Sequence, residues 1–256
     1  MIGCIIQARM GSSRLPGKTL IKLDEHRSAL DFVVNQLSFS TLLDKIVIAT
    51  TNLEQDDIIK KNAKTLGIDC FRGSSDDVLD RYYHCAKEFQ INTIVRITSD
   101  CPLIDPQIVD HVIKKYQDED YDYVTNTLIR SYPIGTDVEI FSFETLEKTW
   151  QKAILPSERE HVTLFIRNKK SGFKLGNLKN SKNLSHLRWT LDREEDLNLI
   201  RRIVVKVNKN PILMNDILNL FSVEPELIKI NEHIPQNEGL LKSLKKDDEF
   251  QNLKTN

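Results

Sequence analysis

The sequence has few of the residues that mark specialised classes of protein. Its 256 residues include only 4 cysteines, 9 glycines and 8 prolines, and 40% of them are hydrophobic. This composition excludes intrinsic disorder, a collagen-like repeat and a small disulfide-stapled domain. An excess of positive charge is also missing, since 36 Lys and Arg face 37 Asp and Glu. The near balance argues against a general nucleic-acid-binding protein but does not exclude one small anionic ligand.

The sequence also lacks the patterns of a zinc site, a secreted protein and a membrane protein. Its cysteines are widely spaced and form no C-x-x-C pair or Cys/His cluster, so we expect free thiols in a reducing compartment. Only about six weakly apolar residues precede Arg9, too few for a signal-peptide core or a membrane span. We therefore expect a cytoplasmic protein that binds neither nucleic acid nor a membrane.

Short β-branched apolar runs alternate with amphipathic stretches along the chain. The expected strands lie at 3–7, 46–50, 68–71, 93–98, 122–125, 137–141 and 187–191. The expected helices lie at 28–40, 54–66, 75–90, 106–117, 142–154, 157–169 and 193–207. This rhythm predicts a three-layer α/β/α, Rossmann-like domain over residues 1–222, built on a mostly parallel mixed sheet. Residues 223–256 are predicted to add a short docked helix and a frayed polar tail.

The strongest local signal is the loop after the first expected strand, QARMGSSRLPGKT. It carries Arg9, Arg14 and Lys18, with no acidic residue before Asp24. A glycine- and serine-rich turn leaving a parallel strand exposes backbone N–H groups, and three cations beside them make a polyphosphate cradle. The loop is not a P-loop, since five residues rather than four separate its two glycines. The alternative is an ordinary turn with basic residues on its surface.

The string IIQARMGSSRLPGKTL resembles the signature of the CMP-sugar synthetase type cytidylyltransferases, which include the activating enzymes for Kdo and sialic acid. It is most similar to their spore-coat-polysaccharide, SpsF-like branch. The resemblance implies a nucleotide-diphospho-sugar transferase fold, CTP as the nucleotide and a homodimer. In that family the loop binds the triphosphate, which implies this role for Arg9, Gly11, Ser12, Ser13, Arg14 and Lys18.

Nucleotidyl transfer needs charge neutralisation at the phosphates, normally by Mg²⁺ held on one or two carboxylates. Asp100 leaves a β-branched run, VRITSDCP, at the strand end where ligands bind in open α/β sheets. It resembles the metal-binding aspartate of the family. Asp192, in LRWTLDREED, resembles the late aspartate that completes the family's metal site. The alternative for Asp192 is a helix N-cap, whereas Asp105 is already available to cap the helix after Asp100.

The segment from Arg72 to Tyr82 is similar to family segments that lie beside the nucleotide base and ribose. The resemblance makes Gly73, Asp77, Val78 and Arg81 candidates for nucleotide binding. The alternative is a structural role: serines and acidic residues at the start of a helix stabilise it by capping and need no ligand to explain them. Arg96 lies inside an apolar strand and must have partners there. It either pairs internally or points toward the nucleotide.

Two further segments resemble family elements near the acceptor. YPIGTDVEIF matches the pattern P-x-G-x-x-x-E-x-F, which makes Pro133, Gly135 and Glu139 substrate-binding candidates. The alternative is an edge strand with Glu139 in water. SEREHVT matches an E-H-V-T element and adds Glu160 and His161. His161 could shuttle a proton, bind phosphate or serve only the structure.

Together these patterns predict attack by a hydroxyl of an acidic sugar, or of a related acid, on the α-phosphate of CTP. Arg14, Lys18 and Asp100 are the predicted catalytic residues, and Mg²⁺ is the predicted cofactor, held by Asp100 and Asp192. One alternative is a glycosyltransferase of the same fold that uses a nucleotide sugar. The D-x-D patterns at 118–122 would suit that enzyme, but they follow a predicted helix instead of a strand. A second alternative is a nucleotide-binding module without catalysis.

Overall fold

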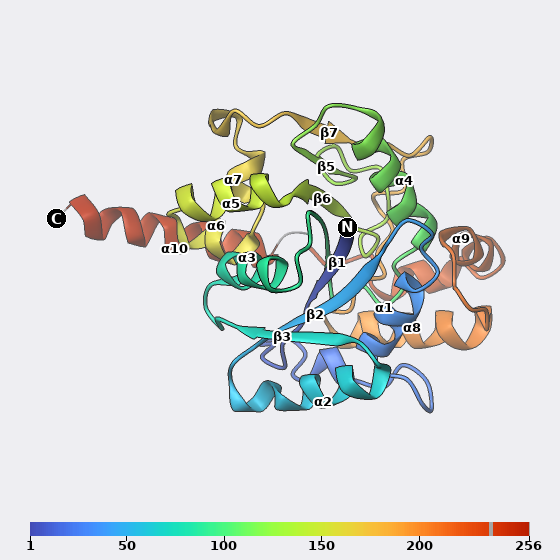
Figure 1. Cartoon of the computed structure of the whole chain (residues 1–256). Helices are drawn as coiled ribbons and strands as arrows, with labels where there is room; N and C mark the ends of the chain where they lie inside the picture. Colours follow the sequence, from blue (N-terminus) through green and yellow to red (C-terminus); the bar gives the residue numbers. More distant parts are fainter. Residues whose placement is uncertain (236–237, 256) are drawn as a thin grey trace.

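The computed structural model describes residues 1–235 and 238–255, arranged around a single sheet (Figure 1). The seven strands lie in the order β3-β2-β1-β4-β6-β5-β7. The strands are β1 (Ile2–Gln7), β2 (Lys45–Thr51), β3 (Asp69–Gly73), β4 (Thr93–Thr98), β5 (Tyr123–Thr125), β6 (Glu139–Ser142) and β7 (Leu175–Asn177). β6 runs antiparallel to its neighbours β4 and β5, and the other described strand pairs are parallel. The predicted mostly parallel mixed sheet is confirmed.

Helices cover both faces of the sheet, which completes the predicted three layers. The helices are α1 (Ala29–Leu37), α2 (Asp57–Leu66), α3 (Val78–Glu88), α4 (Pro106–Asp118), α5 (Phe143–Lys152), α6 (Pro156–His161), α7 (Leu164–Arg167), α8 (Glu194–Val207), α9 (Met214–Val223) and α10 (Glu238–Thr255). α1, α2 and α4 share one apolar core with alternate residues of the strands, and α3, α5 and α7 share the other. Ile5 and Ile6 of β1 are fully buried in opposite cores, as expected for a central parallel strand.

A third apolar cluster joins α8, α9 and the 3₁₀ helix Pro225–Ile230 to the body beside α1. Its largest member, Trp189, is fully buried. This cluster explains why the strand predicted at 187–191 is wrong. The apolar residues of that segment pack against α8, and the segment makes only an isolated bridge between Ile134 and Arg188. The sheet edge is instead β7, a three-residue strand whose central Gly176 gives little β signal.

Two other predicted elements differ from the structure. The helix expected at 157–169 is divided into α6 and α7 at Val162, whose φ of 61° lies in the left-handed region. The tail expected to fray forms α10, which runs beside α6 (Figure 1). Within the described residues, no helix is both long and apolar enough to cross a membrane.

Candidate active site

The loop after β1 closes on itself through its own backbone. The N–H groups of Ser12 and Gly17 both donate to the carbonyl of Met10, at 3.0 and 3.3 Å. Gly17 has a φ of 70°, which glycine adopts without strain, and it leads into the 3₁₀ turn Lys18–Leu20. The Thr19 hydroxyl donates to the carbonyl of Arg9 at 2.8 Å. These bonds hold the cationic side chains of the loop around one space.

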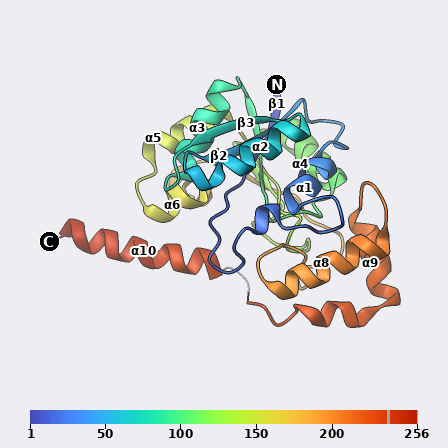
Figure 2. The ribbon, with the colours of Figure 1, turned by 90° about the horizontal axis from the view of Figure 1, so that it is seen from below.

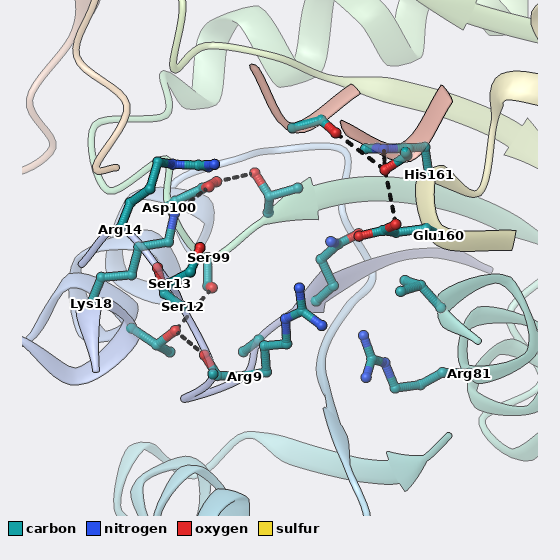
Figure 3. A pocket seen from close by; sticks show the side chains of 18 of the residues that line it. Arg9, Ser12, Ser13, Arg14, Lys18, Arg81, Ser99, Asp100, Glu160 and His161 are labelled. Carbon is teal, nitrogen blue, oxygen red and sulfur yellow. Dashed lines mark hydrogen bonds and ion pairs between the residues drawn. The ribbon is translucent and has the colours of Figure 1, made fainter. Parts of the chain in front are cut away.

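That space is a cavity of about 340 Å³ (Figure 3). All six residues predicted to bind the triphosphate line it, and so do Val78, Arg81 and Asp100. Figure 3 shows Glu160 and His161 across the cavity from Arg14, Lys18 and Asp100. Residues brought together from β1, α3, the end of β4 and α6 therefore face one another around a single hollow.

Lys18 lies between the two aspartates predicted to hold the metal. Its Nζ is 2.9 Å from Asp100 Oδ2 and 2.9 Å from Asp192 Oδ1. Arg14 Nε approaches Asp192 Oδ2 to 2.7 Å. The alternative role of Asp192 as a helix cap is wrong, because Asp196 accepts hydrogen bonds from the backbone at the start of α8. The structure thus places the three predicted catalytic residues and the second metal candidate in one ion-pair cluster.

The charges in this cluster hold both carboxylates ionised. Burial would raise the pKa of Asp100, but the Lys18 charge and a hydrogen bond from Thr98 outweigh it and lower the pKa to about 2. Burial would also raise the pKa of Asp192, but hydrogen bonds and charges from Arg14 and Lys18 outweigh it, so the pKa is lowered. Burial would lower the pKa of Lys18, but the two aspartates raise it. All three groups are therefore charged at neutral pH.

The same carboxylates suit a magnesium ion. Two oxygens that converge on one ammonium group offer the pair of hard ligands that Mg²⁺ takes from proteins, its remaining ligands being water and phosphate oxygens. Across residues 1–235 and 238–255, no three His, Cys, Asp or Glu side chains gather to hold a metal ion. A site at Asp100 and Asp192 would therefore depend on oxygens from the bound nucleotide.

Arg81 is a buried cation that forms no ion pair with a carboxylate among residues 1–235 and 238–255. Its side chain is 1% exposed, its guanidinium donates to the carbonyl of Ser74 at 3.0 Å, and its Nε has no hydrogen-bond partner among the described residues. Burial accordingly lowers its pKa. Gly73 makes room for it, since a Cβ there would lie 3.1 Å from Arg81 Cγ. Arg81 therefore brings a positive charge, which no ion pair of the described residues neutralises, to the wall of the first cavity.

Asp77, in contrast, serves the local structure. Its carboxylate accepts from the backbone of Asp80 at 2.8 Å and caps α3. It also pairs with Arg159 of α6, with Nε at 2.8 Å. Asp77 lies outside the cavity lining, so the structure favours the capping interpretation that the sequence left open.

A second cavity of about 580 Å³ adjoins the first and shares Thr98, Asp100 and His161 with it. Gly135 lines it with a φ of 103°, and a Cβ there would lie 2.7 Å from the backbone nitrogen of Thr190. Glycine is therefore required by both conformation and space. Pro133 stands beside this wall and accepts a hydrogen bond from the Thr136 hydroxyl at 2.8 Å. Arg130 and Arg167, which no sequence motif singled out, also line the cavity.

Glu139 lines the second cavity. It is 4% exposed, which excludes the alternative of an edge strand facing water, and β6 is an interior strand. Its carboxylate pairs with Arg96 and Arg167 and accepts hydrogen bonds from Tyr123 at 2.5 Å and Thr163 at 2.7 Å. Burial would raise its pKa, but the two arginines hold it well below the usual range. Arg96 therefore pairs internally, and it also donates to Gln7 Oε1 at 2.9 Å.

Acid should destabilise the fold through these carboxylates. A carboxylate with a lowered pKa stabilises the folded state above its ordinary pKa, about 3.9 for aspartate. That contribution is lost as the pH falls toward the folded-state pKa, which for Asp100 is about 2. We expect the contribution of these carboxylates to the urea midpoint to be level from neutral pH down to about pH 5 and to fall steeply below about pH 4. In Asp100→Asn the fall should be smaller, and a fall equal to that of the wild type would contradict this assignment.

Comparison with known proteins identifies the family. A sequence model described as Cytidylyltransferase matches residues 3–225. The chain belongs to this family. This cytidylyltransferase is 33% identical over 230 residues to the spore coat polysaccharide biosynthesis protein SpsF of Bacillus subtilis, covering 87% of this chain and 94% of that protein.

Solved structures agree with the family and with the fold. A cytidylyltransferase from Leptospira borgpetersenii superposes with a TM-score of 0.85 at 34% identity, covering 89% of this cytidylyltransferase and 96% of that chain. A CMP-2-keto-3-deoxy-manno-octonic acid synthetase in complex with CTP superposes with a TM-score of 0.62 at 15% identity, covering 80% and 98%. At this lower identity the likeness shows the fold alone. It confirms the predicted nucleotide-diphospho-sugar transferase architecture.

Proposed function

We propose that this cytidylyltransferase transfers CMP from CTP to a hydroxyl of an acidic sugar or related acid and releases pyrophosphate. The observation that carries the proposal is the ion-pair cluster of Lys18, Asp100 and Asp192, in which Lys18 lines the first cavity and Asp100 lines both. One cavity is sized and charged for a triphosphate, and the other offers space for an acceptor. The two reactants would then meet at Asp100, which lines both cavities.

The residues of the loop would bind the phosphates. Backbone N–H groups around Gly11 and Ser13, with Arg9, Arg14 and Lys18, favour the negative charge that spreads over the α-phosphate and the leaving pyrophosphate. Within the described residues no ion pair neutralises Arg9, so its charge is available to a phosphate. Mg²⁺, when bound, supplies further neutralisation, and Asp100 and Asp192 would hold it.

Three features support CTP and an acidic acceptor. The synthetase compared above, a protein of the same fold, binds CTP. The positive charge of Arg81, which lines the first cavity, suits a carbonyl oxygen or phosphate of a nucleotide. In the second cavity, Arg130 holds Asp137 through bonds of 2.6 and 2.7 Å, a pairing geometry that a carboxylate of the acceptor can reproduce.

A release assay tests the function. CTP, UTP, GTP and ATP are each incubated with Mg²⁺ and a panel of acid sugars and sugar phosphates. We expect pyrophosphate only with CTP and an acidic acceptor. Nucleotide sugars are incubated in parallel, and release of a nucleoside diphosphate from one of them, without pyrophosphate from CTP, would establish the glycosyltransferase alternative. CTP binding without turnover on any acceptor would favour a module without catalysis.

A further inference from the structure

The C-terminal helix α10 contributes to both cavities although it lies beyond the residues that the family model matches. That match ends at residue 225, whereas α10 begins at Glu238. Gly239, Ser243 and Lys246 line the first cavity. Spacings of four and three residues put them on one face of the helix. Figures 1 and 2 show α10 passing alongside α6 and continuing away from the sheet.

Polar contacts fix α10 on two sides of the site. Asp247 is 6% exposed and accepts a hydrogen bond of 2.9 Å from the backbone of Ser157, in the first turn of α6. At the other side, Glu238 pairs with Arg193 at 2.7 and 2.8 Å. Arg193 directly follows Asp192 of the ion-pair cluster. The helix thus connects α6, which carries His161, to Arg193, the residue that follows Asp192.

Ser243 connects α10 to His161 through a short chain of hydrogen bonds. Its hydroxyl donates to Glu160 Oε2 at 2.8 Å, and its oxygen lies 2.9 Å from His161 Nε2. A hydroxyl has one proton, and the negatively charged carboxylate is its preferred acceptor. Ser243 therefore accepts a hydrogen bond from Nε2–H of His161. This arrangement leaves the lone pair of the neutral imidazole on Nδ1.

Lys246 brings a loosely held cation to the first cavity. Its Nζ is 3.4 Å from Glu160 Oε2, a longer contact than those in the Lys18 cluster, and 59% of its side chain is exposed. An exposed pair at this distance is weak and can be exchanged for a more strongly charged partner. Lys246 reaches the cavity from α10, whereas Lys18 reaches it from the loop after β1.

We propose that α10 is a working part of the active site, in which Lys246 binds a phosphate of the nucleotide and Ser243 positions His161 beside the acceptor. The proposal rests on the proposed function and adds residues that the family model does not include. Ser243 is a positioning residue, because it acts through His161, which lines both cavities.

Two neighbouring lysines provide a matched test of the phosphate contact. Lys246→Ala is expected to raise the KM for CTP about 10-fold, the equivalent of one lost charge-assisted hydrogen bond. Lys246→Arg should restore most of the affinity. Lys245→Ala, the control, removes the same charge from an exposed position outside both cavity linings and should leave KM unchanged. Equal KM values for the two alanine variants would overturn the role of Lys246.

Ser243→Ala tests the positioning of His161. We expect kcat to fall about 10-fold with little change in the KM for CTP, because the variant disturbs the imidazole and keeps the phosphate contacts. Simple undocking of α10 would instead raise the KM for CTP as Lys246→Ala does. A Ser243→Ala variant with wild-type kcat, or with the KM change alone, would overturn the positioning role.

Measurements of CTP binding and pyrophosphate release by the wild type distinguish failure of this proposal from failure of the proposed function. If the wild type releases pyrophosphate from CTP, the kinetic tests decide the role of α10. If it binds CTP without turnover, the proposed function fails, and calorimetric Kd values for CTP with Lys246→Ala and Lys245→Ala decide the role of Lys246. Absence of CTP binding by the wild type would overturn both proposals.

Discussion

Replacement of Asp100 by Asn is expected to lower pyrophosphate release by about 10³-fold. The carboxylate lies at the junction of the two cavities, 2.9 Å from Lys18 Nζ, and is half of the proposed metal site. The amide keeps the size of the side chain but loses its negative charge, so it neither orients Lys18 nor attracts Mg²⁺ as a carboxylate does. Initial rates of pyrophosphate release at saturating CTP measure the effect.

The matched control for this substitution is Asp118→Asn, at an exposed position at the end of α4. It makes the same chemical change away from the cavities and should retain wild-type rates. Thermal unfolding of both variants shows whether the fold is intact. Turnover of Asp100→Asn equal to that of the Asp118 control would remove Asp100 from the mechanism.

Replacement of Glu139 by Ala is expected to lower the free energy of unfolding by about 3–5 kcal/mol. The substitution leaves Arg96 and Arg167 without the buried carboxylate that compensates both, and it removes the acceptor for the Tyr123 hydroxyl. Truncating one member of a buried charge network costs far more than the network contributes, because the remaining charges stay desolvated. Urea unfolding at neutral pH, followed by circular dichroism, measures the change.

Glu144→Ala provides the comparison for this effect. Glu144 is 75% exposed in the first turn of α5 and pairs with Lys148 on the surface, so its loss should leave the stability almost unchanged. A loss below about 1 kcal/mol in Glu139→Ala would mean that water relaxes around the two arginines and that the network is not a structural requirement.

The central strands of the sheet could be predicted from the sequence, because their apolar pattern fits only one kind of secondary structure. β1, β2 and β4 are short runs rich in β-branched apolar residues, and such runs are typical of strands with helices on both faces of the sheet. The loop stood out in the sequence because a glycine-rich turn after a parallel strand has few other uses for three positive charges with no acidic residue within the loop. β7 could not be predicted, since three residues around a glycine carry almost no periodic signal.

The structure brings Asp192 close to Lys18 and Arg14, although the strand predicted before it is wrong. The segment before it forms no strand in the sheet, yet it reaches Asp100 through backbone contacts, with Leu191 N–H donating to the Asp100 carbonyl at 2.7 Å. The Thr190 hydroxyl donates to the same carbonyl at 3.0 Å. Ser243 and Lys246 gave no signal, because each lies more than 80 residues along the chain from the α6 residues it contacts and belongs to a polar stretch without an apolar period.

The division between α6 and α7 is a γ-turn, in which Val162 has φ 61° and ψ −53° and Thr163 N–H donates to the His161 carbonyl at 2.5 Å. In a continuous helix, side chains two residues apart point in directions about 200° apart. The turn instead lets His161 and Thr163 line the same cavity. Its backbone conformation costs about 1–3 kcal/mol for a non-glycine residue. Glycine would relieve that strain, but the fully buried side chain of Val162 anchors the turn in the apolar core and holds it in one conformation.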